Sequence, residues 1–427
     1  MRFKPTGYHL INVSTGREFE DRGWTLSDPL GGAPSLVRAV YENRKFVPND
    51  SLEGLYRYAG WMPVRRILRK SCAPVTYRSK GLAKTLGLEN LYITFSGWCP
   101  RLGAKMKTCS FKETEAYSIL ARMDGKEKRT LIVQSAGNTA RAFAQVCSDN
   151  KIPVVICIPQ DSGHDLWFRR RLDKCVKLVA VPHGCDYYDA IVVGEKLAQD
   201  PSFFLEGGAK NVARRDGMGT TILSFAEAAG RIPDAYFQAV GSGTGAIAAY
   251  ENACRLEATG DFGKNNMRVY VAQNAPFSLI YDSWKAGSRE LAPLDPEKGR
   301  RDAGIILAKV LANRKPPYSI AGGLYDTLKE SGGDVFLADN DSIMYWMMKF
   351  RNVEGYDLLP ASCAAVSALA QAVEKGVVSR DEFIMLNCTG GGTLLAMSKG
   401  YVFKEPDLVL DPDLPAEEII SRVKALF

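Results

Sequence analysis

The sequence of 427 residues predicts an α/β fold built on parallel sheets and divided into two or more domains. The main evidence is the alternation of apolar strands and helical segments between residues 130 and 208, because a strand–helix–strand series places its strands parallel in one sheet. Strands and helices continue to alternate after residue 220. Glycine-containing turns follow several of these strands, and ligands of α/β proteins gather at such turns.

Composition and charge exclude several classes of protein. Hydrophobic residues make up 46% and charged residues 24% of the chain, which is ordinary for a globular protein. No apolar run approaches the roughly 20 residues of a membrane span, and the N-terminus lacks the apolar core of a signal peptide. We therefore expect a cytoplasmic protein without membrane contacts. The net charge of +7 is mild and suits small anionic substrates, and no basic run with interleaved aromatics suggests nucleic acid.

Residues 1–45 are expected to form a small opening module in which a short strand twice turns at glycine. Two such knuckles are typical of a zinc ribbon, which carries a C-x-x-C pair in each. The four ligand positions here hold Asn12, Thr15, Ser27 and Leu30, none of which supplies a thiolate. The sequence therefore predicts a degenerate zinc-ribbon-like module. With only three histidines and no C-x-x-C pair in the chain, we expect no metal site.

The remaining elements follow from hydrophobic periodicity and turn residues. Strands are predicted at 91–94, 131–134, 153–158, 176–181, 203–205, 235–240, 268–272 and 383–387. Helices are predicted at 51–58, from residue 112 onward, and at 140–148, 166–172, 188–198, 220–229, 246–257 and 415–427.

The loop Gly241-Ser242-Gly243-Thr244-Gly245 lies between a predicted strand and a predicted helix. Its glycines allow backbone N–H groups to approach a phosphate closely. With Ala246 the loop also fits the dinucleotide fingerprint G-x-G-x-x-G/A. A nicotinamide enzyme needs an acidic residue after the next strand, however, and Gln273 and Asn274 stand there. A phosphate cradle is favoured, with an NAD-dependent dehydrogenase and a merely tight turn as alternatives.

Polar residues in three other segments are candidates for ligand binding. The turn Ser135-Ala136-Gly137-Asn138-Thr139 follows a strand, and its asparagine either caps the next helix or contacts a ligand. Thr389 precedes three glycines. Its hydroxyl either caps a helix or forms a hydrogen bond with a ligand, such as the ring nitrogen of a pyridine-containing cofactor. Asn211 and Arg214 belong to a basic stretch that is either a solvated loop or a binding site for phosphate or sulfonate.

Lys112 opens a predicted helix a short way before the turn at 135–139. Most lysines are solvated, but several anion-favouring turns surround this one in the predicted sheets. Burial and the helix dipole lower the pKa of a lysine, so that it can serve as nucleophile or base. We expect Lys112 to hold pyridoxal 5′-phosphate as a Schiff base.

The order of these motifs resembles the fold-type II (tryptophan synthase β-like) pyridoxal-phosphate enzymes, and within them the threonine synthase family. That family's S-F-K-D-R motif corresponds to Ser110-Phe111-Lys112-Glu113-Thr114, and its S-S/T-G-N-T turn to residues 135–139. Its N-P-x-R-x-x-G segment is similar to residues 211–217. Its glycine-rich phosphate loop and its T-G-x-G turn match 241–245 and 389–392. The likeness covers nearly the whole chain.

The sequence departs from threonine synthases on the substrate side of the lysine. Asp-Arg after the lysine is Glu113-Thr114 here, and the usual proline and glycine before it are Lys107 and Cys109. Overall the sequence is most similar to the cysteate synthases of methanogenic archaea. This implies a transferase of coenzyme M biosynthesis that converts O-phospho-L-serine and sulfite to L-cysteate and phosphate by β-replacement through an aminoacrylate intermediate. Alternatives are threonine synthase acting on O-phosphohomoserine, a sulfide-using β-replacement enzyme, and a regulatory relative that binds no cofactor.

The resemblance also implies a role for each motif. The cofactor phosphate would lie on Gly241, Ser242, Gly243, Thr244 and Gly245, the ring oxygen near Asn138 and the ring nitrogen near Thr389. The substrate carboxylate would bind Ser135, Ala136, Gly137 and Thr139, and the leaving phosphate would bind Asn211 and Arg214. Residues 46–116 and 220–427 would form a large cofactor-binding domain, and residues 117–219 a small mobile α/β domain. A homo-oligomer, dimer or trimer, is expected.

Overall fold

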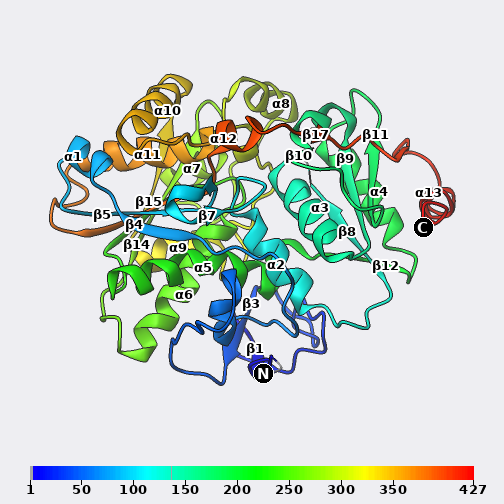
Figure 1. The fold of residues 1–427 in the computed structure, drawn as a ribbon, viewed down its shortest axis with the longest axis horizontal. Helices are drawn as coiled ribbons and strands as arrows, with labels where there is room; N and C mark the ends of the chain where they lie inside the picture. The colour runs from blue at the N-terminus through cyan, green and yellow to red at the C-terminus, as the bar shows by residue number, and fades with distance from the viewer. Residues whose placement is uncertain (1–2, 136) are drawn as a thin grey trace.

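Two parallel sheets flanked by helices form the body of the molecule, with a small antiparallel module packed below them in the view of Figure 1. The computed structural model describes residues 3–135 and 137–427. The helix α2, which begins at Lys112, lies between the two sheets (Figure 1). The α/β class with parallel sheets, expected from the sequence, is confirmed.

The larger sheet has six strands in the order β15–β14–β13–β16–β5–β4, all parallel except β4. It lies between α11 on one face and α5 and α6 on the other, and this cover explains its continuous apolar strands. The strands are β4 (Val75–Arg78), β5 (Asn90–Phe95), β13 (Ala235–Ala239), β14 (Arg268–Asn274), β15 (Asp334–Ala338) and β16 (Phe383–Cys388). The helices are α1 (Gly81–Leu86), α5 (Val212–Ala229), α6 (Thr244–Thr259), α7 (Leu279–Lys285), α8 (Pro296–Ile305), α9 (Leu324–Ser331), α10 (Asn340–Glu354), α11 (Pro360–Glu374) and α12 (Thr393–Met397).

The smaller sheet has five parallel strands in the order β12–β8–β9–β11–β18. Its central strands β9 and β11 are buried almost throughout, as expected for strands covered on both faces. The strands are β8 (Thr130–Gln134), β9 (Val154–Pro159), β11 (Val176–Val181), β12 (Phe203–Leu205) and β18 (Leu408–Val409). The associated helices are α2 (Lys112–Arg122), α3 (Asn138–Asn150), α4 (Tyr187–Leu197) and α13 (Ala416–Lys424).

The C-terminal segment crosses from the larger sheet to the smaller one, which corrects the assignment of all of residues 220–427 to the large domain. Strand β18 pairs with β11, and α13 packs against α4 at the edge of the molecule (Figure 1). The side chains of Leu410, Ile419 and Val423 are buried in one apolar cluster with Ile132 and Val179 of the smaller sheet. Burial of these side chains holds the segment there.

The helix predicted at 166–172 does not form. A short 3-10 turn, η3 (Gln160–Asp165), leads instead into β10 (Trp167–Phe168), which pairs with β17 (Val402–Phe403). Both aromatic side chains of β10 are buried. Because the pairing partner lies far along the chain, a tertiary contact overrides the local helical pattern here.

The N-terminal module is a three-stranded antiparallel sheet of β1 (Tyr8–Asn12), β2 (Glu18–Phe19) and β3 (Val37–Tyr41). Its two predicted knuckles meet, because the Asn12 amide donates to Asp28 Oδ2 over 2.9 Å. The same amide accepts a hydrogen bond from the Ser14 N–H over 3.0 Å. An asparagine thus links the two turns. Its kinship with a zinc ribbon stays a prediction. Across residues 3–135 and 137–427 no group of His, Cys, Asp or Glu is arranged to hold a metal ion.

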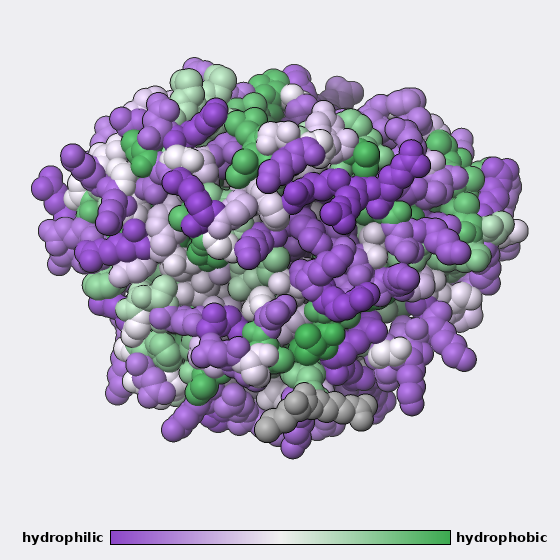
Figure 2. All heavy atoms as spheres, in the orientation of Figure 1, coloured by the Kyte–Doolittle hydropathy of each residue, from purple (hydrophilic) through white to green (hydrophobic). Residues whose placement is uncertain are grey.

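One face of the molecule carries mainly hydrophilic side chains, with apolar ones scattered among them (Figure 2). In the part of the chain that the structure describes, no helix combines the length and the apolar character needed to cross a bilayer. The ten cysteines of the sequence are all free thiols, and six of them are buried.

Candidate active site

Lys112 is the first residue of α2 and lies beside the turn that follows β16. The Phe111 N–H donates to the Thr389 carbonyl over 2.9 Å, and Ser110 forms a bridge with Gly390. The Ser110 hydroxyl accepts the N–H of Lys112 over 3.3 Å, which fixes the start of the helix. Two motifs that are far apart in the sequence are therefore adjacent in the fold.

The glycine-rich loop joins β13 to α6 and also contacts the lysine segment. Gly243 has φ +76 and, as the N-cap residue of α6, has no side chain to cap it. The Ser242 hydroxyl accepts the Thr244 N–H over 3.3 Å, and the next N–H groups of the first turn point toward the loop, where an anion can bind. A Cβ placed on Gly245 would lie 3.0 Å from the Phe111 ring and 2.7 Å from Gln238. Glycine is therefore required here by close packing, and the loop borders the residue that precedes Lys112.

Gly137 and the start of α3, which follow β8, lie against the segment that leads into Lys112. The Arg141 guanidinium donates to Asn138 Oδ1 and to the Thr108 carbonyl, each over 2.8 Å. Gly137 has φ +94, which favours glycine. Arg141 thus ties the small-domain turn to the segment that leads into Lys112. The predicted contact at Ala136 lies outside the described residues.

Lys112 lies in a buried charged cluster. Its Nζ is 3.1 Å from Glu115 Oε2, and Arg214 Nη1 is 3.1 Å from Glu115 Oε1. Arg214 also forms an ion pair with Glu206. Burial, the main cause, and the neighbouring charge of Arg214 lower the pKa of Lys112, whereas Glu115 opposes this shift. A lysine whose pKa is lowered carries more neutral amine, the form that attacks an aldehyde or accepts a proton.

Asn211, one of the two predicted phosphate ligands, forms three hydrogen bonds within the protein through its side chain. Its Oδ1 accepts from Ala213 N–H (3.0 Å) and from Arg122 Nη1 (2.7 Å), and its Nδ2 donates to the Glu206 carbonyl (2.7 Å). The residue is completely buried and caps α5. In this arrangement Asn211 supports the segment that carries Arg214. A direct contact with substrate phosphate stays a prediction for both residues.

Three charged residues of this region were missed by sequence reasoning: Glu115, Glu206 and Arg141. All three are buried among residues of the predicted site. One signal was available for Glu115, which stands three residues after Lys112 and hence on the same helix face. Glu113 is also buried, and it accepts from the Thr108 N–H and hydroxyl; burial raises its pKa to about 7.

The structure argues against a dinucleotide at the glycine-rich loop. Gln273, at the end of β14, uses its Oε1 to accept the N–H groups of Ile280 and Tyr281 over 2.8 and 2.9 Å. Asn274 is buried beside it and donates to the Ala338 carbonyl. Both amides hold the larger domain together, and neither supplies the carboxylate that a nicotinamide ribose requires.

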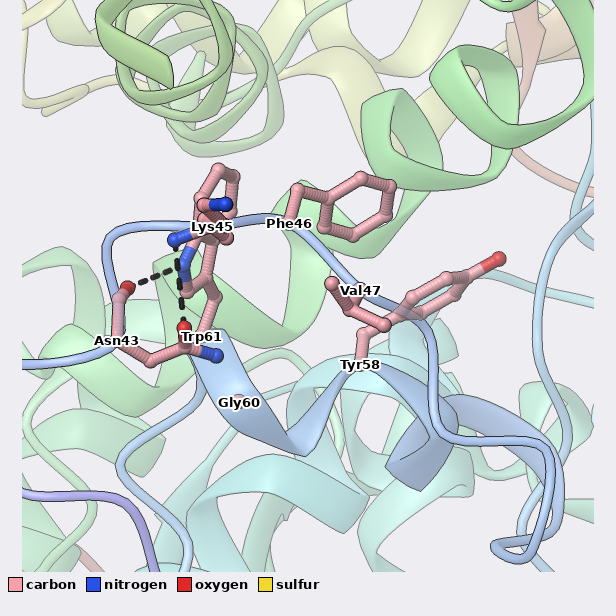
Figure 3. A pocket seen from close by; sticks show the side chains of 7 residues that line it. All are labelled: Asn43, Lys45, Phe46, Val47, Tyr58, Gly60 and Trp61. Atoms are coloured by element: carbon pink, nitrogen blue, oxygen red, sulfur yellow. Dashed lines mark hydrogen bonds between the residues drawn. The ribbon is translucent and has the colours of Figure 1, made fainter. Parts of the chain in front are cut away.

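A separate hollow lies against η1 (Gly54–Trp61), away from the predicted site residues (Figure 3). Three of its seven lining residues are aromatic, and the centre of the Phe46 ring lies 5.2 Å from that of Trp61 and 5.9 Å from that of Tyr58. The Trp61 indole donates to the Asn43 carbonyl over 2.8 Å. These contacts join residues 43–47 to η1. None of the predicted site residues lines this hollow.

The glycine-rich loop, Asn138 and Thr389 thus follow the C-terminal ends of β13, β8 and β16, and Lys112 opens α2 beside Thr389. These groups fit pyridoxal phosphate. The N-terminus of α6, which Gly243 leaves without an N-cap side chain, suits the phosphate, and the Lys112 amine, whose pKa is lowered, suits the aldehyde. Thr389 is buried beside the segment that carries Lys112. A Cβ on Gly241 would lie 2.7 Å from the Val310 carbonyl oxygen. The glycine-rich loop is therefore packed against the segment that contains Val310.

Comparisons with known proteins agree with this geometry. Residues 78–406 match the family of pyridoxal-phosphate dependent enzymes. The chain is 42% identical to a cysteate synthase of Methanocella paludicola over 98% of both chains. It is 44% identical to a cysteate synthase of Methanoculleus marisnigri, over 90% of this chain and 88% of that one.

Two solved structures share the fold. Maize serine racemase superposes with a TM-score of 0.55 at 17% identity, covering 75% of this chain and 91% of that one. Threonine deaminase isoform 2 of Solanum lycopersicum gives a TM-score of 0.52 at 18% identity, over 77% and 88% of the two chains. The chain thus belongs to the pyridoxal-phosphate dependent enzymes and, within them, to the cysteate synthase family.

Proposed function

We propose that this enzyme makes L-cysteate and phosphate from O-phospho-L-serine and sulfite, as a step of coenzyme M biosynthesis. The observation that carries the proposal is the identity of 40–44% to cysteate synthases over nearly the whole chain. Threonine synthase activity and NAD-dependent dehydrogenation are not favoured by these relatives. A cytoplasmic location is part of this proposal, and the metabolic character of the cysteate synthase relatives supports it.

Pyridoxal phosphate, when bound, supplies an electron sink that stabilises negative charge at the substrate Cα. Lys112 would hold the cofactor, and once the substrate amine replaces it the free amine would take the Cα proton and later return it. Burial lowers the pKa of Lys112, which increases the share of neutral amine that can take a proton. Thr389 would face the ring nitrogen with a neutral hydroxyl. Such a contact leaves that nitrogen unprotonated, which favours elimination of phosphate over transamination.

The anionic groups of the substrate would bind on the small-domain side of the site. The substrate carboxylate fits the turn at 135–139, where a glycine of φ +94 opens α3 without a side-chain cap. Arg214 is the predicted partner of the substrate phosphate, supported by Asn211 at the start of α5. Small anions are the expected partners, and a homo-oligomer, dimer or trimer, remains our expectation for the assembly.

Product analysis tests this function. Purified enzyme receives phosphoserine with sulfite, phosphoserine with sulfide, or phosphohomoserine with water, and cysteate, cysteine, threonine and phosphate are measured. We expect cysteate and phosphate in equal amounts from the first mixture only. The Lys112→Ala variant should form none. Threonine from the third mixture at a comparable rate would replace the proposal by threonine synthase, and cysteine from the second would identify sulfide as the nucleophile.

A further inference from the structure

A carboxylate stands directly against the amine of Lys112. Glu115 is three residues further along α2, its side chain is completely buried, and its Oε2 lies 3.1 Å from Lys112 Nζ. A buried carboxylate is costly unless cations or hydrogen bonds compensate it. Here two cations do so, because Arg214 Nη1 approaches Glu115 Oε1 to 3.1 Å. Glu115 therefore joins the lysine to α5.

Arg214 is in turn held from its other side. It forms an ion pair with Glu206, which lies in the turn before α5, and that carboxylate also accepts the Gly208 N–H over 2.9 Å. The two carboxylates raise the pKa of Arg214, so this guanidinium stays charged. Among the described residues three buried atoms of this row still lack a hydrogen-bond partner: Glu115 Oε1, Glu206 Oε2 and Arg214 Nε. These three atoms can therefore still form hydrogen bonds with a further group.

Taken together, the charged side chains form an alternating row of Lys112, Glu115, Arg214 and Glu206. No other charged side chain among the described residues is placed to act strongly on the lysine, although Tyr187 of α4 faces Arg214. The row is neutral while Lys112 is protonated. When Lys112 loses its charge, the row becomes anionic, and this favours return of the proton to the lysine nitrogen.

We propose that Glu115 is a positioning residue for Lys112: it holds the lysine nitrogen in place and favours its protonated form, and Arg214 with Glu206 keeps Glu115 in that position. The proposal rests on Lys112 being the cofactor lysine of the proposed function. It also assigns Arg214 a role before any substrate arrives. A substrate phosphate at this guanidinium would therefore share it with the two carboxylates that already contact its Nη1 and Nη2 atoms.

The test follows protonation of the lysine nitrogen, without substrate. In the holoenzyme the visible absorbance of the cofactor is titrated with pH. An opposite charge at this range shifts a pKa by about one to three units. We therefore expect Glu115→Gln to lower the midpoint by at least about one unit. In cofactor-free protein, mass spectrometry should find that an amine-reactive probe labels Lys112 roughly tenfold faster in this variant at pH 7.

Two matched variants separate this role from general damage. Glu206→Gln removes a carboxylate that contacts Arg214 but not Lys112. It should shift the midpoint by less than half the shift of Glu115→Gln. Glu113→Gln changes the buried carboxylate that binds Thr108 and should leave the midpoint in place. Equal shifts in Glu113→Gln and Glu115→Gln, or no shift in Glu115→Gln, would overturn the proposal.

Glu115→Asp covers the case in which the amide variant does not fold. Aspartate keeps the negative charge but holds it further from Lys112, so its midpoint should lie between those expected for the wild type and for Glu115→Gln. A midpoint below the one expected for Glu115→Gln would contradict the proposal. Because neither measurement uses phosphoserine or sulfite, an enzyme with a different substrate would still show the shift. Failure of the proposed function and failure of this inference are thus distinguishable.

Discussion

The buried carboxyl of Glu113 makes the stability of this protein depend on pH in a way that one substitution should remove. The residue follows Lys112, is 1% exposed, and accepts two hydrogen bonds from Thr108. Burial, its main perturbation, raises the pKa of Glu113 from 4.5 to about 7. Between these values the folded state binds more protons than the unfolded state, so stability falls as pH rises through this range.

The size of the effect follows from the pKa shift. A pKa shift of about 2.5 units corresponds to about 3 kcal/mol of the free energy of unfolding. This contribution is present at low pH and is lost in full once the pH exceeds the folded-state pKa of about 7. Glutamine keeps an acceptor for Thr108 and has no charge. For a chain of 427 residues the unfolding entropy is about 0.9 kcal/mol/K, so 3 kcal/mol corresponds to about 3 °C.

The assay is thermal unfolding of the wild type and Glu113→Gln at pH 5 and pH 8, followed by circular dichroism. We expect the wild-type midpoint to fall by about 2–3 °C more than that of the variant between the two pH values. Taking the difference between the two proteins removes the contributions of all other titrating groups. A parallel decline in both proteins would refute the account of Glu113 as a carboxyl that is neutral when buried.

Three further substitutions have defined outcomes. Arg141→Gln leaves acceptors at Asn138 and the Thr108 carbonyl unpaired, so pyridoxal phosphate should bind roughly tenfold more weakly in an absorbance titration; unchanged affinity would separate Arg141 from the site. Gly243→Ala forces alanine to φ +76 and should cost about 1–2 kcal/mol of stability by denaturant unfolding, and no loss would mean that the loop relaxes freely. Arg122→Met leaves Asp21 buried without its cation and should cost about 3–5 kcal/mol, whereas a cost below 1 would show that this ion pair matters little.

Much of the fold could be predicted because local patterns and the final structure agree. The strands 176–181 and 203–205 were predicted with the bounds that the structure has, since continuous apolar runs between turns identify buried parallel strands. The path of the C-terminal segment could not be predicted. Strands β17 and β18 have two residues each, and they are stabilised by partners more than 200 residues away in the sequence.

The candidate site shows the same division between local and distant information. Glycines and a lysine at turn positions identify the cofactor segments, because each requirement is local. The surroundings of Lys112 depend on how α2 packs against α5, which brings Arg214 to Glu115. No spacing in the sequence reveals that contact. Likewise, the sequence suggests Asn211 as a ligand, and only the fold shows that its amide forms three hydrogen bonds within the protein.

Identification of the residue that bears the cofactor tests the central claim most directly. The purified holoenzyme is reduced with borohydride, which fixes the cofactor on its lysine, and the digested protein is examined by mass spectrometry. We predict a single pyridoxyl-modified peptide, with the modification on Lys112. A modification on any other lysine, with Lys112 recovered unmodified, would contradict the account of the site given above.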